Sequence, residues 1–182
     1  MHELTPPGSF GLAVISGKTG KLVRWGQDIV DGRRTTYTHA FFVLDKGEVI
    51  EAEPGGAEIN PVSKYLGRPD VLFSDKPVQE ALNFFPWANR QDLEGTLRHV
   101  MVERARGLEG IPYNYLDYVA IGLEHFNIDV PFVRNRVRRE DRMICSQLVD
   151  YIYTICGIHL FRDGRVSQDV TPGDLELYAT AP

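Results

Sequence analysis

Cys145 is the residue of this chain best placed to act as a nucleophile. It stands in the segment MICSQLVDYIY (143–153), where a polar stretch gives way to an apolar one. Leu148, Val149 and Ile152 follow at helical spacing, which predicts a helix that begins close to the thiol. The free N–H groups and the dipole of a helix N-terminus stabilise a thiolate, which is the reactive form of cysteine. A cysteine hydrolase also needs an imidazole that carries protons and a polar group that orients it.

His39 is the histidine that best fits the proton-carrying role. It lies inside the aromatic and β-branched run YTHAFFVL (37–44), which predicts a strand. A histidine buried there needs partners for its ring nitrogens. Glu51 follows twelve residues later, within EVIEAEP (48–54), which predicts the returning strand of a hairpin that turns at Gly47.

The length of the hairpin loop decides whether His39 and Glu51 share a face of the sheet. A three-residue loop, or a bulge, places both side chains on one face, whereas a two-residue loop places them on opposite faces. Glu53 lies two residues beyond Glu51 and is the alternative orienting carboxylate. The sequence leaves both alternatives open.

The second cysteine, Cys156, is expected to be a core residue near the end of the same helix. Eleven residues along a helix span about 16 Å, and a disulfide needs Cα atoms within about 7 Å of each other. The two cysteines therefore should not pair. Two cysteines without a cluster of histidines also argue against a structural zinc site.

Three segments together resemble a known family of cysteine hydrolases. They are CSQLV (145–149), GIPY (110–113) and THAFFVLDKGEVIEA (38–52). In these segments the chain resembles the NlpC superfamily of papain-like cysteine hydrolases, in the circularly permuted form in which the histidine precedes the cysteine. That form belongs to the YiiX-like and lecithin retinol acyltransferase-like branch.

The resemblance implies a papain-like fold and a role for each of four residues. Cys145 would attack a carbonyl group and form an acyl-thioester, His39 would carry the proton, and Glu51 would orient the imidazole ring. The backbone N–H of Cys145 would face the developing oxyanion. Tyr113 would help to form the same oxyanion pocket.

The rest of the chain supplies the elements that must position these residues. Strands are expected at 10–16, 37–44, 48–54 and 71–73, and helices at 21–30, 79–85, 90–108, 115–126 and in the Cys145 segment. The tail is interpreted as a TPGD turn followed by a last short strand. Strands that come before helices predict an α+β fold, in which the helices pack on one face of an antiparallel sheet.

Length and composition favour a single domain over residues 1–182. Hydrophobic residues make up 43% of the chain and charged residues 25%, as in an ordinary globular protein. The net charge of −5 argues against general nucleic-acid binding. The sequence contains neither an apolar run of membrane-helix length nor a secretory signal. We therefore expect a cytoplasmic protein, with delivery by a phage or an export system as the alternative.

A basic segment, RNRVRREDR (134–142), carries five arginines. One interpretation is a solvated loop whose charge is compensated by Glu140 and Asp141. The other is a rim that attracts an anionic substrate, such as a peptide carboxylate or a lipid headgroup.

Taken together, the residues and the resemblance imply a thiol hydrolase that acts on amide bonds in peptides or cell-wall peptides. Acyl transfer to or from a lipid is an alternative enzyme activity, and it requires an apolar acyl channel. A third hypothesis is a catalytically idle protein that binds a partner, for example in a virion. No metal or organic cofactor is implied, and the sequence specifies no oligomeric state.

Overall fold

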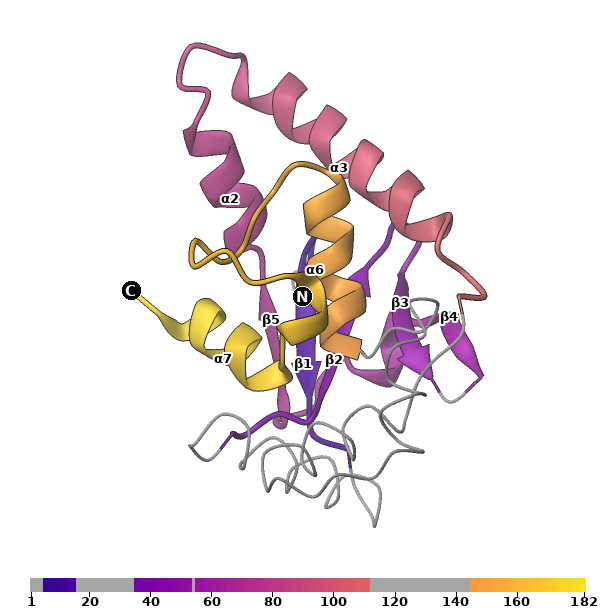
Figure 1. Ribbon diagram of the computed structural model, residues 1–182. Helices are drawn as coiled ribbons and strands as arrows, with labels where there is room; N and C mark the ends of the chain where they lie inside the picture. Colours follow the sequence, from indigo (N-terminus) through magenta and orange to yellow (C-terminus); the bar gives the residue numbers. More distant parts are fainter. Residues whose placement is uncertain (1–4, 16–34, 54, 112–144) are drawn as a thin grey trace.

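The structure is a computed structural model that describes residues 5–15, 35–53, 55–111 and 145–182 (Figure 1). These residues form an α+β fold with one five-stranded antiparallel sheet and four α-helices. The strands are β1 (Phe10–Ala13), β2 (His39–Val43), β3 (Glu48–Glu53), β4 (Gly56–Pro61) and β5 (Val71–Ser74). The helices are α2 (Lys76–Asn83), α3 (Arg90–Arg106), α6 (Cys145–Ile155) and α7 (Pro172–Thr180), with short 3-10 helices η1 (Val62–Lys64) and η2 (Ser167–Asp169). The predicted α+β class is confirmed.

Most of the elements predicted within the described residues are present. The four expected strands appear as β1, β2, β3 and β5, and the order across the sheet is β4-β3-β2-β1-β5. The helices expected near 79–85 and 90–108 appear as α2 and α3, and the Cys145 segment forms α6. The helices expected at 21–30 and 115–126 lie outside the described residues.

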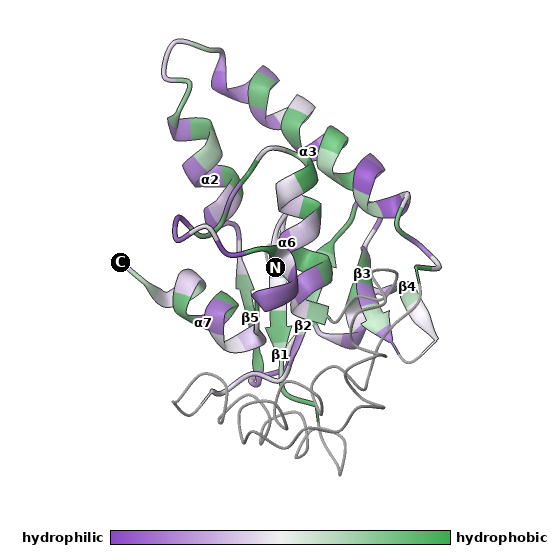
Figure 2. Ribbon diagram, viewed as in Figure 1, coloured by the Kyte–Doolittle hydropathy of each residue, from purple (hydrophilic) through white to green (hydrophobic). Residues whose placement is uncertain are grey.

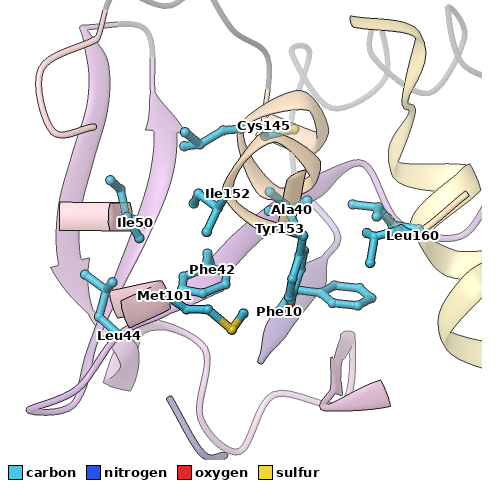
Figure 3. Close-up of a cluster of buried hydrophobic side chains, with 14 of the residues drawn as sticks. Phe10, Ala40, Phe42, Leu44, Ile50, Met101, Cys145, Ile152, Tyr153 and Leu160 are labelled. Carbon is cyan, nitrogen blue, oxygen red and sulfur yellow. The ribbon is translucent and has the colours of Figure 1, made fainter. Parts of the chain in front are cut away.

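Side chains alternate between the two faces of the sheet, and both faces are buried. On one face Phe10, Phe42 and Ile50 pack against α6 and α3, as Figure 3 shows. On the other face Phe41 and Val49 form a smaller apolar cluster with the segment that includes η1. Within the described chain, the helices α2, α3, α6 and α7 all join the first of these cores, which confirms that helices cover one face.

Helix α6 lies across the middle of the sheet and touches β2, β3, α3 and α7 (Figure 1). Leu148, Val149 and Ile152 are fully buried against the sheet, and Figure 2 shows apolar and polar residues mixed along the helix. The turn after the helix ends with Gly157 at a φ of 80°, a conformation that favours glycine. Gly157 therefore permits the turn that ends the helix.

The β2–β3 hairpin closes through a three-residue loop, Asp45 to Gly47. The Leu44 N–H donates to the Glu48 carbonyl, and Phe41 stands opposite Glu51 in the register. Lys46 and Gly47 both have positive φ, at 55° and 74°. An odd number of loop residues places His39 and Glu51 on the same face.

Strand β4 was not anticipated, because PGGAEIN combines residues with low strand propensity. The strand forms through long-range pairing with β3 over six residue pairs. A second chain segment approaches its far edge, where the Ala57 N–H donates to the Ile111 carbonyl. Gly56 permits this approach, because a Cβ there would lie 2.8 Å from the Ile111 oxygen.

The prediction of a turn and a short strand for the tail was wrong, because the tail forms helix α7. Thr171 caps this helix in a reciprocal arrangement with Asp174, and Pro172 occupies its first turn. The TPGD tetrapeptide that suggested a turn is thus the start of a helix. Leu175 is fully buried and anchors the helix to the core.

Candidate active site

His39 and Glu51 form a buried pair at one end of the β2–β3 hairpin. The Nε2 atom of His39 lies 2.6 Å from Oε2 of Glu51. The exposed fraction is 5% for His39 and 0% for Glu51, so water contributes little to either group. The carboxylate therefore fixes the orientation of the imidazole ring within the protein interior.

Cys145 completes the group. It is the first residue described in α6, is 2% exposed, and its side chain interacts with the ring of His39. Residues 39, 51 and 145 come from two neighbouring strands and a helix far along the chain, and the fold brings them together. The catalytic roles assigned to them in the sequence analysis stay predictions.

The surroundings of His39 favour its protonated form. Burial lowers the pKa of the ring, but hydrogen bonds and charge interactions with Cys145 and Glu51 outweigh burial and raise the pKa from 6.5 to about 9. Such an imidazolium can accompany a Cys145 thiolate as an ion pair. The pair lies in the protein interior, away from bulk water. Charge interactions are stronger there than at the surface.

Glu51 remains ionised despite its burial. Burial raises the pKa of the carboxyl group, but hydrogen bonds with His39, Tyr65 and Lys64 outweigh it and lower the pKa from 4.5 to about 2. Because the carboxylate can only accept, His39 donates from Nε2. The imidazole thus has a defined donor position toward Glu51.

Tyr65 and Lys64 are site residues that the sequence analysis missed. The Tyr65 hydroxyl donates to the same Glu51 oxygen as His39. The Lys64 ammonium donates to the other Glu51 oxygen at 2.9 Å. Both residues lie in the segment after β4, where neither spacing nor residue type distinguishes them from an ordinary connection.

The structure decides between the two candidate carboxylates. Glu51 contacts His39, whereas Glu53 accepts a hydrogen bond from Lys64 at 2.9 Å and is partly exposed. Lys64 thus bridges both carboxylates of β3. The alternative in which Glu53 orients the imidazole is not supported by this geometry.

A stack of aromatic rings holds Tyr65 in place. The Phe41 and Tyr65 rings lie 3.9 Å apart at an interplanar angle of 12°. The Phe41 ring also covers Gly11 of β1 so closely that a Cβ at position 11 would overlap it. The absence of a side chain at Gly11 therefore leaves the space in which this stack forms.

A cavity of about 290 Å³ reaches His39 at the end of the sheet where β1 and β3 stop and β2 begins. Its lining includes the charged side chains of Glu53, Lys64 and Arg68, together with Tyr65. Arg68 is itself held by Asp70 at 2.7 Å and by the Val14 carbonyl. The surface next to the imidazole therefore combines these charged side chains with the apolar residues Ala13, Val14 and Ile15.

Other predicted features of the site lie partly or wholly outside the described residues. Of the GIPY segment, Gly110 and Ile111 hydrogen-bond to Ala57 in β4. Tyr113 and the basic segment 134–142 lie outside the described residues, so their roles stay predictions.

The described part of the chain contains no group of three histidine, cysteine, aspartate or glutamate side chains that could hold a metal ion. Within the same ranges, no helix is long and apolar enough to cross a membrane. Cys156 is a free, half-buried thiol away from Cys145, as its position in the sequence predicted.

Comparison with known proteins found no match to this chain among protein-family models or curated proteins. The geometry of the site therefore carries the functional inference.

Proposed function

We propose that this protein is a thiol hydrolase of the papain-like, circularly permuted NlpC type, with Cys145 as nucleophile, His39 as proton carrier and Glu51 as orienting group. One observation carries the proposal: the buried ring of His39 interacts with the Cys145 side chain and lies 2.6 Å from the Glu51 carboxylate. An inert core thiol needs neither partner. A nucleophile needs a base, and the base needs an orienting group.

In the first half of the reaction, the sulfur of Cys145 bonds to the carbonyl carbon of an amide. The thiol proton resides on His39, and the electron pair of the carbonyl moves to oxygen. Because Glu51 engages Nε2, we assign the proton transfer to Nδ1. We assign stabilisation of the oxyanion to the backbone N–H of Cys145, because α6 begins at this residue and a helix N-terminus favours negative charge. The intermediate then expels the amine, which takes the proton from His39.

In the second half, water hydrolyses the acyl-thioester. His39 accepts a proton from the water as its oxygen bonds to the acyl carbon, and the carbon–sulfur bond breaks. The acid product leaves, and Cys145 and His39 return to their starting state. Glu51 remains ionised throughout and stabilises the imidazolium, which is consistent with its lowered pKa of about 2.

The surroundings of His39 favour a peptide over a lipid substrate. The cavity that reaches the imidazole has charged side chains from Lys64 and Arg68 in its lining. Polar groups of that kind suit a peptide or cell-wall peptide, whereas an acyl chain needs apolar walls. Amide hydrolysis is therefore the activity that we infer, ahead of acyl transfer.

The test is the pH dependence of Cys145 alkylation by iodoacetamide, followed by peptide mass spectrometry. An ordinary thiol has a pKa of about 8.5 and reacts slowly below it. If Cys145 and His39 form an ion pair, Cys145 should react at pH 6–7 many times faster than Cys156, since burial raises the pKa of the Cys156 thiol.

Two histidine variants make the result specific. His39→Ala should remove the fast reaction of Cys145 at pH 6–7, because the thiolate loses its cation. His99→Ala is the matched control, since His99 is exposed on α3, and it should change nothing. If Cys145 reacts no faster than Cys156 in the unaltered protein, the hydrolase is refuted and a binding role takes its place.

A further inference from the structure

A second cavity, of about 810 Å³, lies between α2, α3, α7 and the segment after α6. Cys156 lines it, and Cys156 follows the C-terminal end of α6, whereas Cys145 lies at the other end. Eleven residues of helix separate two points by about 16 Å. This cavity is therefore separate from the candidate active site and has no part in the hydrolase proposal.

The walls of this cavity are mostly apolar. They include Leu82, Leu93, Leu97, Ile158 and Leu160. Its volume falls in the range of about 300–1,000 Å³ that is usual for sites of small molecules. The space opens to solvent beside Phe84 and Phe85, and it has the size and the apolar lining that sites of small molecules usually have.

Aromatic side chains border the cavity without being covered. Phe84 and Phe85 both line it, yet 65% and 48% of their surfaces are exposed. Both residues follow α2 in the connection to α3, which stands out from the sheet in Figure 1. An apolar occupant would bury part of these rings, which favours binding by about 25 cal/mol for each Å² removed from water.

The cavity is lined by one basic side chain, Arg162, which is exposed, and by one acidic side chain, Glu80. Arg162 lines it, and within the described chain no carboxylate pairs with this guanidinium. The one carboxylate in the lining, Glu80, is already engaged, because it accepts a hydrogen bond from Tyr178 at 2.7 Å and lies 3.9 Å from the Lys76 ammonium. Arg162 is therefore the group available to an anionic ligand.

We propose that this cavity binds an amphiphile with one aliphatic chain and a carboxylate, the chain lying among the leucines and the carboxylate pairing with Arg162. Apolar walls and a single unpaired cation match both parts of such a molecule. A neutral hydrocarbon would leave the guanidinium without a partner. An amphiphile with a cationic head would place two positive charges together.

Cys156 provides a built-in reporter for the test, because its half-buried thiol lines the cavity. The full chain is alkylated with iodoacetamide at pH 8.5 in the presence of decanoate, and both cysteine peptides are quantified by mass spectrometry. Decanoate should slow alkylation of Cys156 in a saturable way and leave Cys145 unchanged. Decylamine, which has the same chain and a positive head, should protect only at concentrations about tenfold higher.

Two substitutions separate the apolar and the charged parts of the site. Ala81 is half-buried on α2 and lines the cavity, so Ala81→Phe should fill the space and abolish protection. Arg162→Glu should raise the half-protecting concentration by about fivefold or more, as for loss of a partly exposed ion pair. Arg162→Lys keeps the positive charge and should therefore retain most of the affinity for decanoate. Lys46→Glu, in the exposed turn between β2 and β3, is the control with the same change in net charge.

The outcomes are decisive in both directions. Equal protection by decanoate and decylamine, or no effect of Arg162→Glu, would overturn the assignment of the carboxylate. Absence of protection by decanoate up to its solubility limit would overturn the site as a whole. Protection only by an apolar peptide would assign the cavity to a protein partner instead. The result is independent of the hydrolase proposal, since Cys145 serves only as an internal reference.

Discussion

Replacing Glu51 by glutamine tests the electrostatic basis of the candidate site. Glutamine keeps the size of the side chain and removes its charge, so it resembles the protonated carboxyl group. The change leaves His39 and Lys64 with a neutral partner in a position that is fully buried. We expect a pH-dependent loss of stability, because the pKa values of Glu51 and His39 both differ between the folded and unfolded chains.

The magnitude follows from the pKa of Glu51. The difference between its ordinary value of 4.5 and about 2 in the folded chain corresponds to about 3 kcal/mol. Because the pKa is lowered, this stability is fully present above pH 4.5 and is lost as the pH falls toward 2. For His39, whose pKa is raised from 6.5 to about 9, the stability is present below pH 6.5 and is lost as the pH rises through 9.

The two pH windows overlap between 4.5 and 6.5. Both pKa shifts include the same interaction between Glu51 and His39, so their free energies are not added. The deficit of Glu51→Gln should therefore be about 3 kcal/mol at pH 5.5 and should shrink toward pH 2, where the carboxyl group of the unaltered protein is itself protonated.

Urea unfolding followed by circular dichroism at pH 2.5, 4, 5.5 and 8 measures these differences. Glu53→Gln is the matched control, because Glu53 lies on the same strand and contacts the same lysine but is partly exposed. A surface ion pair of that kind contributes at most about 1 kcal/mol. A deficit for Glu51→Gln that is equal to that of Glu53→Gln, or that does not change between pH 5.5 and 2.5, would refute the reasoning.

Two further substitutions test how the carboxylate is held. Tyr65→Phe removes one of the two donors to Oε2 of Glu51 and should lower the free energy of unfolding by about 1.5–3 kcal/mol, the range for a hydrogen bond to a charged group. It should also slow Cys145 alkylation at pH 6–7, because a less firmly held carboxylate orients His39 less well. Gly11→Ala should destabilise by about 1–3 kcal/mol, since the new methyl group overlaps the Phe41 ring and displaces the stack that supports Tyr65. Urea unfolding and the alkylation profile measure both effects.

Each of these changes has a control in the same chain. Tyr178→Phe removes a hydroxyl that donates to the exposed Glu80, so it should leave the alkylation of Cys145 unchanged. Gly95→Ala lies on α3 with open space around the new methyl group and should stabilise by up to about 1 kcal/mol. If Gly11→Ala is tolerated as well as Gly95→Ala, the close packing of Phe41 on β1 has been misassigned.

The sequence by itself determined the local elements and the types of residue at the site. Apolar, aromatic and β-branched runs around a turn predicted β1, β2 and β3, and helical spacing predicted α6 after Cys145, because residue type and spacing act through near neighbours. The same reasoning did not predict helix α7 in the tail or strand β4, for two different reasons. The TPGD segment carries signals for both a turn and a helix cap, and β4 forms by pairing with β3 in spite of its composition.

Only the tertiary structure decided which residues meet. A loop of three residues rather than two placed His39 and Glu51 on one face, and that count depends on how the two strands pair. The choice of Glu51 over Glu53, and the entry of Tyr65 and Lys64 into the site, arise because the chain folds back from β4 over the sheet. Contacts between distant segments leave no periodic signal in one sequence, so the partners of a buried charge become visible only when the fold is known.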